Sequence, residues 1–174
     1  MKKIGIGIIG CGRIAQLRHI PEYAANEHAQ LKGFFDVNLS RAEELAARYG
    51  GKAYDSYQAL LADPEIDAVS VLTPNFTHAE ISIAALKAGK HVLCEKPMAV
   101  TLADCEAMAE TARQTGKKLM IGQNQRLTPA HRKARELLQS GAIGDVISFR
   151  TTFAPSGADN WSIDGKNSWF MDKN

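Results

Sequence analysis

The sequence predicts an α/β fold in which helices cover both faces of a parallel sheet. Short apolar runs rich in β-forming residues alternate with helical segments along most of the chain. The runs are almost continuously apolar, as in strands that are buried on both faces. Glycine or proline marks most boundaries between the two kinds of segment. This alternation indicates a doubly wound sheet.

The expected strands are short apolar runs with clear boundaries. They are Ile4–Ile9, Leu31–Asp36, Lys52–Tyr54, Ala68–Leu72, His91–Cys94 and Lys118–Ile121.

The expected helices have recognisable starts. Ser40, Thr77 and Thr101 are each followed three residues later by an acid, which is a capping-box pattern. A first helix begins at Arg13 and is interrupted at Pro21, which opens a second short helix. Further helices are expected around Tyr57–Ala62 and from Thr128-Pro129.

The pattern changes after Gly144. Val146–Phe153 alternates apolar and polar residues, which predicts a half-buried antiparallel strand at the edge of a sheet. The tail, Ala154–Asn174, shows no clear element. We therefore predict a dinucleotide-binding domain over residues 1–124 and the incomplete start of a second α/β domain over residues 125–174.

Composition excludes several classes of function. Lys and Arg number 21 against 19 Asp and Glu, with no basic cluster, so the electrostatics do not indicate a nucleic-acid partner. Three widely spaced cysteines form neither a disulfide framework nor a zinc site, which favours a reducing, cytoplasmic setting. No apolar run is long enough to span a membrane, and Ile4–Ile9 is too short and glycine-interrupted for a signal peptide.

The first motif is Gly10-Cys11-Gly12-Arg13-Ile14-Ala15, between an expected strand and an expected helix. Gly10 permits a tight turn, Gly12 lets the backbone approach a pyrophosphate, and Ala15 allows close packing of helix on strand. The helix start presents N–H groups and partial positive charge to the phosphates. This context favours a Rossmann-type dinucleotide site over a plain glycine turn.

Asp36 ends the second expected strand, where an acid accepts hydrogen bonds from the adenosine ribose and repels a 2′-phosphate. NAD is therefore favoured over NADP. Arg41 lies a few residues further on and either faces a 2′-phosphate or is an ordinary solvated arginine. Both interpretations stay open, so NADP remains an alternative cofactor.

Two more polar segments follow strands directly, at the edge where open α/β sheets bind ligands. Thr73, Pro74, Asn75 and His78 follow the fourth strand, and an ordinary turn with a helix cap explains them equally well. Glu95-Lys96-Pro97 follows the fifth strand. A lysine there can orient a substrate hydroxyl and share its proton, although a surface lysine in a turn is the alternative. His19, His28, His91 and His131 show no ligand spacing and are assigned to the surface or to helix caps.

Together these segments resemble the Gfo/Idh/MocA family of oxidoreductases. The glycine motif is common to many proteins, but its combination with Glu95-Lys96-Pro97, and with Asn124 and Arg126 past the sixth strand, is more specific. The resemblance implies that Lys96 is catalytic. It also implies cofactor contacts by Gly10, Gly12, Arg13, Ile14, Asp36, Thr73, Asn75, His78, Glu95 and Asn124.

The resemblance further implies reversible hydride transfer between a nicotinamide ring and a sugar, cyclitol or related hydroxyl. Full-length members would carry a second domain with a largely antiparallel sheet and are expected to form homo-oligomers. The family's glycine-rich segment with an Asp-x-x-x-His pair has no counterpart here. We therefore expect this chain alone to bind NAD without turning over substrate. The alternative is a non-catalytic dinucleotide-binding module or redox sensor, against which Lys96 argues.

Overall fold

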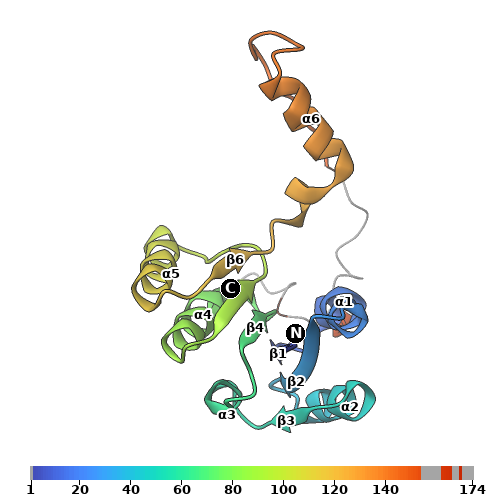
Figure 1. Cartoon of the computed structure of the whole chain (residues 1–174), viewed down its shortest axis with the longest axis vertical. Coiled ribbons are helices and arrows are strands. Elements are labelled where there is room, and N and C mark those ends of the chain that lie inside the picture. The colour runs from blue at the N-terminus through green and yellow to red at the C-terminus, as the bar shows by residue number, and fades with distance from the viewer. Residues whose placement is uncertain (1, 154–161, 166–168, 170–174) are drawn as a thin grey trace. The chain divides into compact units, whose positions relative to one another are not determined.

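The computed structural model describes residues 2–153, 162–165 and 169. Within these residues one parallel sheet of six strands runs in the order β3-β2-β1-β4-β5-β6 (Figure 1). The order reverses between β1 and β4, which are neighbours and from which the chain winds outward in both directions. The strands are β1 (Ile4–Ile9), β2 (Ala29–Phe35), β3 (Lys52–Tyr54), β4 (Ala68–Val71), β5 (His91–Cys94) and β6 (Leu119–Ile121).

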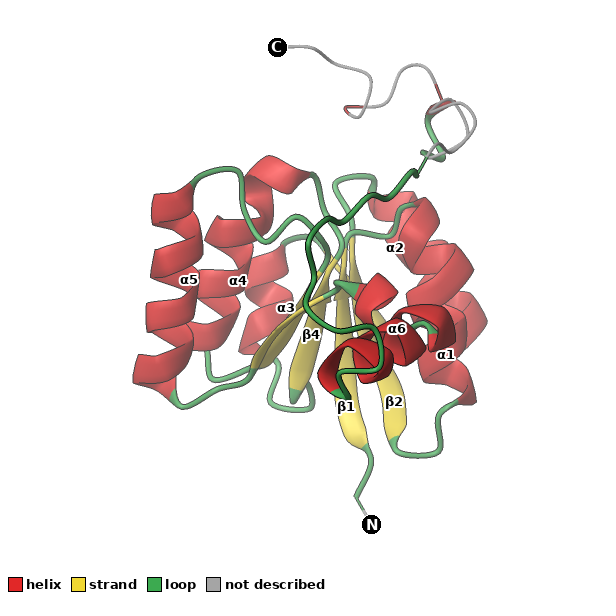
Figure 2. Ribbon diagram, turned by 90° about the horizontal axis from the view of Figure 1, so that it is seen from above, coloured by secondary structure: helices red, strands yellow, loops and turns green. Residues whose placement is uncertain are grey.

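Helices lie on both faces of the sheet, with α1 and α2 on one side and α3, α4 and α5 on the other (Figure 2). The α-helices are α1 (Ile20–Ala25), α2 (Leu39–Tyr49), α3 (Tyr57–Ala62), α4 (His78–Lys87), α5 (Leu102–Thr115) and α6 (Pro129–Gln139). Shorter helical turns are the π-turn η1 (Ala15–His19) and the 3₁₀ turns η2 (Asn75–Thr77) and η3 (Asn124–Leu127). The predicted doubly wound fold is confirmed, and each predicted strand up to Ile121 is present within two residues.

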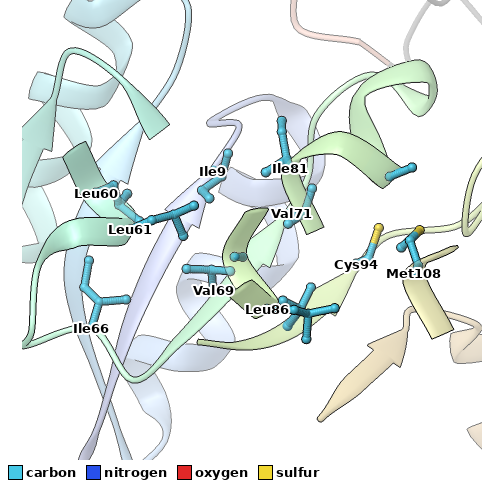
Figure 3. Packing of buried hydrophobic residues seen from close by; sticks show 13 residues of the cluster. Ile9, Leu60, Leu61, Ile66, Val69, Val71, Ile81, Leu86, Cys94 and Met108 are labelled. Atoms are coloured by element: carbon cyan, nitrogen blue, oxygen red, sulfur yellow. The ribbon is translucent and has the colours of Figure 1, made fainter. Parts of the chain in front are cut away.

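Two apolar cores explain why the strands are apolar throughout. Ile9, Val69 and Val71 point to the face covered by α3, α4 and α5, where they pack with Leu86 and Met108 (Figure 3). The alternate β1 residues Ile6 and Ile8 point to the opposite face, where the second cluster includes Phe34 and Leu45. Because side chains alternate along a strand, a sheet with helices on both faces needs apolar residues at successive positions.

The helix after the glycine turn differs from the prediction. Pro21 lies in the first turn of the short helix α1, as predicted, but it does not interrupt the helix before it, because η1 passes directly into α1. The N–H of Ile20 bonds the carbonyl of Ala15, five residues back, which is the wider spacing of a π-turn. The wide turn lies just ahead of Pro21, a residue that has no N–H to give to an ordinary helical bond.

The three capping predictions have different outcomes. Thr101 is confirmed, because its hydroxyl accepts the N–H of Asp104 at 3.1 Å. Thr77 precedes α4, but its hydroxyl donates to the Pro74 carbonyl instead of capping the helix. The Ser40 prediction is wrong: α2 begins at Leu39, after Asn38, whose N–H is held by the side chain of Asp36. A contact made by Asp36 therefore decides where that helix starts.

The described residues form two compact units, one within Met1–Gly122 and Asp159–Asn174 and the other within Gln123–Ala158. In the second unit, η3 leads into α6, and the ring of His131 bonds the carbonyl of Gln125. The strand predicted at Val146–Phe153 is wrong, because these residues form no strand and Ile147 is 98% exposed. A half-buried strand needs a partner for its backbone groups, and no described residue pairs with this segment.

The predicted boundary between residues 124 and 125 stays a prediction. Most of the tail expected to lack clear elements lies outside the described residues, apart from a turn at residues 162–165. Over the ranges described, no helix is both long and apolar enough to cross a membrane.

Candidate functional site

The carboxyl ends of the parallel strands bring the predicted segments to one edge of the sheet. Backbone hydrogen bonds continue past the strand ends: Gly10 N–H donates to the Phe35 carbonyl at 2.8 Å, and Glu95 N–H donates to the Val71 carbonyl at 3.0 Å. The Leu72 N–H likewise donates to the Ile9 carbonyl. The ends of β1, β2, β4 and β5 are thereby held together, and the segments after them form one site.

The glycine turn has two different glycines. Gly10 has φ +94°, and a Cβ on it would lie 2.7 Å from the Leu72 carbonyl oxygen, so the turn and its packing on β4 both require glycine. A Cβ on Gly12 would meet nothing within 4 Å. Gly12 therefore leaves bare backbone facing open space, which suits the close approach of a phosphate.

Asp36 is buried and ties the glycine turn to the end of β2. One carboxylate oxygen accepts the Cys11 N–H at 2.8 Å, and the other accepts the Asn38 N–H at 2.9 Å. A carboxylate has about four acceptor positions, so capacity remains for ribose hydroxyls. Burial and then the charge of Asp36 raise the pKa of the Cys11 thiol to about 12, so this cysteine is a neutral packing group.

Arg41 is not an ordinary solvated arginine. Its side chain is only 18% exposed and lies between two acids, with Nη1 3.5 Å from Asp36 Oδ1 and Nη2 3.0 Å from Asp164 Oδ1. A cavity of about 210 Å³ lies beside it, lined by the glycine turn, Asp36, Thr73 and Pro74 on one side and by residues 162–164 and Trp169 on another. The glycine turn, the acid and the arginine thus share one cavity.

His78 connects two of the loops at this edge. Its ring is buried, with Nδ1 2.7 Å from the Pro97 carbonyl and Nε2 2.9 Å from the Thr73 carbonyl. Both ring nitrogens are therefore directed at backbone oxygens of these two loops, and direct contact of His78 with a cofactor stays a prediction. Asn75, on η2 beside Thr73 and Pro74, is half-buried.

The loop after β5 anchors its backbone and exposes its lysine. Glu95 Oε2 accepts the Lys96 N–H at 3.1 Å, while Oε1 lies 2.9 Å from Nε2 of His19. Burial raises the pKa of Glu95, but the hydrogen bonds from His19 and from the Lys96 N–H outweigh it and hold that pKa below its ordinary value. The Lys96–Pro97 peptide is cis, and the side chain of Lys96 is exposed.

His19 is the residue that sequence reasoning missed. The sequence predicts a surface or helix-cap residue, and His19 does precede α1, but its side chain makes no capping hydrogen bond. The side chain is instead 13% exposed and paired with Glu95. A sequence signal existed: the glycine motif predicts that Ala15 packs closely on a strand, and His19 follows it by four residues, a spacing that shares one helix face.

Asn124 and Arg126 lie on η3, in the second unit, where both are exposed. Arg13 and Ile14, which follow Gly12 at the start of the helix, are exposed as well. Among the residues with described positions, no group of His, Cys, Asp and Glu is arranged to hold a metal ion.

The chain is similar in sequence to known NAD-binding oxidoreductases. A family model described as "Oxidoreductase family, NAD-binding Rossmann fold" (GFO_IDH_MocA) matches residues 4–123. Levoglucosan dehydrogenase of Pseudarthrobacter phenanthrenivorans is 35% identical, over 99% of this chain and 46% of its own length. Myo-inositol 2-dehydrogenase of Thermotoga maritima is 37% identical, over 84% of this chain and 44% of its own length.

A solved structure shares the fold. The 3-ketoreductase KijD10 of Actinomadura kijaniata, in complex with NADP and TDP-benzene, has a TM-score of 0.77 at 35% identity, over 83% of this chain and 44% of its own. The chain thus spans less than half the length of each of these relatives. The match of the model over residues 4–123, together with the glycine turn and the Glu95-Lys96-Pro97 loop at one sheet edge, shows that the chain belongs to the Gfo/Idh/MocA oxidoreductase family, with its NAD-binding Rossmann fold.

Proposed function

We propose that the protein transfers hydride between a nicotinamide dinucleotide and a hydroxyl or keto group of a sugar or cyclitol, and that this chain supplies the cofactor half. One observation carries the proposal: the open backbone of Gly12 and the exposed Lys96 lie on loops at the same edge of the sheet. The substrate class is supported by the names of the relatives, which include a levoglucosan dehydrogenase and a myo-inositol 2-dehydrogenase.

The site residues fit a dinucleotide. The bare backbone at Gly12 and the first N–H groups of the following helix, at Arg13 and Ile14, would hold the pyrophosphate, because such groups have no partner inside their helix. Asp36 would accept the adenosine ribose hydroxyls with its remaining capacity. The charge of Asp36 would repel a 2′-phosphate, so NAD is the preferred cofactor. Arg41 is close enough to Asp36 to face a 2′-phosphate, so NADP is a second one.

Lys96 would act on the substrate. The bound nicotinamide supplies the hydride acceptor or donor, and the protein must hold the substrate oxygen and its proton. A lysine ammonium can donate a hydrogen bond to that oxygen and exchange a proton with it. Glu95 and Pro97 fix the backbone on either side of Lys96, while Thr73, Pro74 and Asn75 would border the cofactor from the neighbouring loop.

For the whole protein we propose, on the basis of the family resemblance, a cytoplasmic enzyme that is homo-oligomeric at full length and takes a small-molecule sugar or polyol. Asn124 would contact the cofactor from the segment after β6, and residues 125–174 would begin the substrate domain.

Titration of NADH into the 174-residue chain, followed by nicotinamide fluorescence, tests the cofactor site. The informative variant is Gly12→Val, because a Cβ at position 12 meets no protein atom within 4 Å and the added side chain would project into the space left for the phosphate. We expect NADH affinity to fall at least about tenfold with little change in the unfolding midpoint. Equal affinity in Gly12→Val and the unmodified chain would contradict the proposed site.

A further inference from the structure

We propose that His19 is a positioning residue for Lys96 and acts through the carboxylate of Glu95. The inference rests on the proposed function, in which Lys96 handles the substrate proton. Its effect on the Lys96 backbone, however, can be measured without any cofactor or substrate.

Two hydrogen bonds connect His19 to the backbone of Lys96 through the carboxylate of Glu95. Nε2 of His19 lies 2.9 Å from Oε1 of Glu95, and Oε2 of the same carboxylate accepts the Lys96 N–H at 3.1 Å. Each oxygen of Glu95 thus has its own partner, so the orientation that suits the histidine also suits the lysine amide. If His19 is removed, the carboxylate loses one of the two contacts that fix its rotation.

Burial separates this pair from an ordinary surface pair. The side chains of His19 and Glu95 are only 13% and 14% exposed. The other His–Glu pair in the described residues, His28 with Glu27, has a separation of 3.7 Å and side chains 63% and 88% exposed. Because water screens exposed pairs, the buried pair holds its geometry more strongly. His28 therefore provides a matched control.

The position of His19 in the chain links the glycine turn to the loop that carries Lys96. His19 is the last residue of the π-turn that follows the glycine turn, and Gln16 of the same turn donates a side-chain hydrogen bond to the Cys11 carbonyl. The segment that would hold the pyrophosphate is thereby connected to the loop that carries Lys96. On the other side of Lys96, His78 contacts the Pro97 carbonyl and does not depend on His19.

The test is amide hydrogen exchange by NMR on the full 174-residue chain without cofactor. In His19→Leu we expect the Lys96 amide to exchange at least about tenfold faster, the scale for weakening a hydrogen bond to a charged acceptor. The Glu95 amide, which bonds the Val71 carbonyl, is the internal reference and should not change. His28→Leu should leave both amides as they are.

A conservative variant separates positioning from general support. The amide nitrogen of a glutamine can reach the place of Nε2 and donate a neutral hydrogen bond, so His19→Gln should restore most of the Lys96 protection. If His19→Leu does not fold, His19→Phe keeps a ring of similar size without a donor for Glu95, and it should expose the Lys96 amide equally. Failure of His19→Gln to rescue would contradict a role through this hydrogen bond.

Two results would overturn the inference: an unchanged Lys96 amide in His19→Leu, or equal acceleration of the Lys96 and Glu95 amides, which would indicate a merely structural residue. NADH titration of the same samples keeps the proposals apart. Normal NADH binding with an unaffected Lys96 amide rejects the positioning role alone. The expected exchange pattern with no NADH binding rejects the cofactor site alone.

Discussion

The two edges of the sheet both bury charged groups, but they use them differently. At the amino edge, buried Lys90 donates to the carbonyls of Asp63 and Ile66 at 2.8 and 2.7 Å, and Asp67 accepts the Gly5 N–H. At the carboxyl edge, Asp36 and Glu95 also hold backbone N–H groups.

The two edges differ in which groups their anchored loops leave exposed. The amino-edge contacts close the connection between α3 and β4. The carboxyl-edge contacts hold loops that leave the Gly12 backbone open and the Lys96 side chain exposed. A buried charge alone therefore does not mark a functional site. Under the proposed function, an exposed lysine on a loop that is anchored by buried charges is a better indicator.

The largest expected effect is at Lys96. In the full-length protein, Lys96→Ala should lower turnover of a polyol substrate by about 10²–10⁴-fold, the scale for a positioned acid–base group. NAD affinity and the unfolding midpoint should barely change, because the side chain is exposed. Steady-state assays with a polyol panel measure this. Robust turnover by Lys96→Ala would place the chemistry on another residue.

Lys90 is the corresponding test at the amino edge. Lys90→Met leaves two carbonyl oxygens without their charged donor and should lower the free energy of unfolding by roughly 2–3 kcal/mol. Urea denaturation measures the loss, with Lys87→Met, an exposed position on α4, as the control. NADH affinity should stay the same. A Lys90→Met chain of normal stability with weakened NADH binding would reverse the assignment of the two edges.

Asp36 has two roles, because it anchors the glycine turn and, in the proposed function, accepts the ribose hydroxyls. Asp36→Ala should weaken NAD binding by about 1–3 kcal/mol through loss of a charged acceptor. NADP should lose less, because Arg41 would then face the 2′-phosphate without a competing acid. Calorimetric titration of both cofactors measures the two changes, and Asp36→Asn, which keeps one acceptor oxygen, should be milder. NADP binding as tight as NAD in the unmodified chain would defeat the specificity argument.

The smallest expected effect is a pH dependence at the amino edge. The Tyr54 hydroxyl and the Glu65 N–H hold the pKa of Asp63 below its ordinary value of 3.8. The unfolded chain then binds more protons just below that pH, so stability falls as pH drops from about 4 through the folded-state pKa. Tyr54→Phe removes the main donor and should make this fall shallower, by less than about 1 kcal/mol. Urea midpoints from pH 2 to 5 measure it, and an unchanged slope would contradict the assignment.

Local pattern explains why much of the architecture was predictable. Six apolar runs, bounded by glycine and polar residues, predicted the strands because apolar run length and turn residues act over neighbouring positions. The same holds for Gly10, whose positive φ permits few other residues. Errors arose where distant residues compete with local preference. The start of α2 follows from the side chain of Asp36, and residues 146–153 lack a partner among the described residues.

The strands, the glycine turn and the positions of Asp36 and Lys96 at strand ends could be predicted from the sequence, because they follow from the order of residue types along short stretches. The partners of these residues, in contrast, depend on the tertiary fold. His19 and Glu95 are 76 positions apart, and Cys11 and Asp36 are 25 apart, so no local sequence pattern predicts either contact. The parallel sheet brings them together, because it places the ends of non-consecutive strands at one edge.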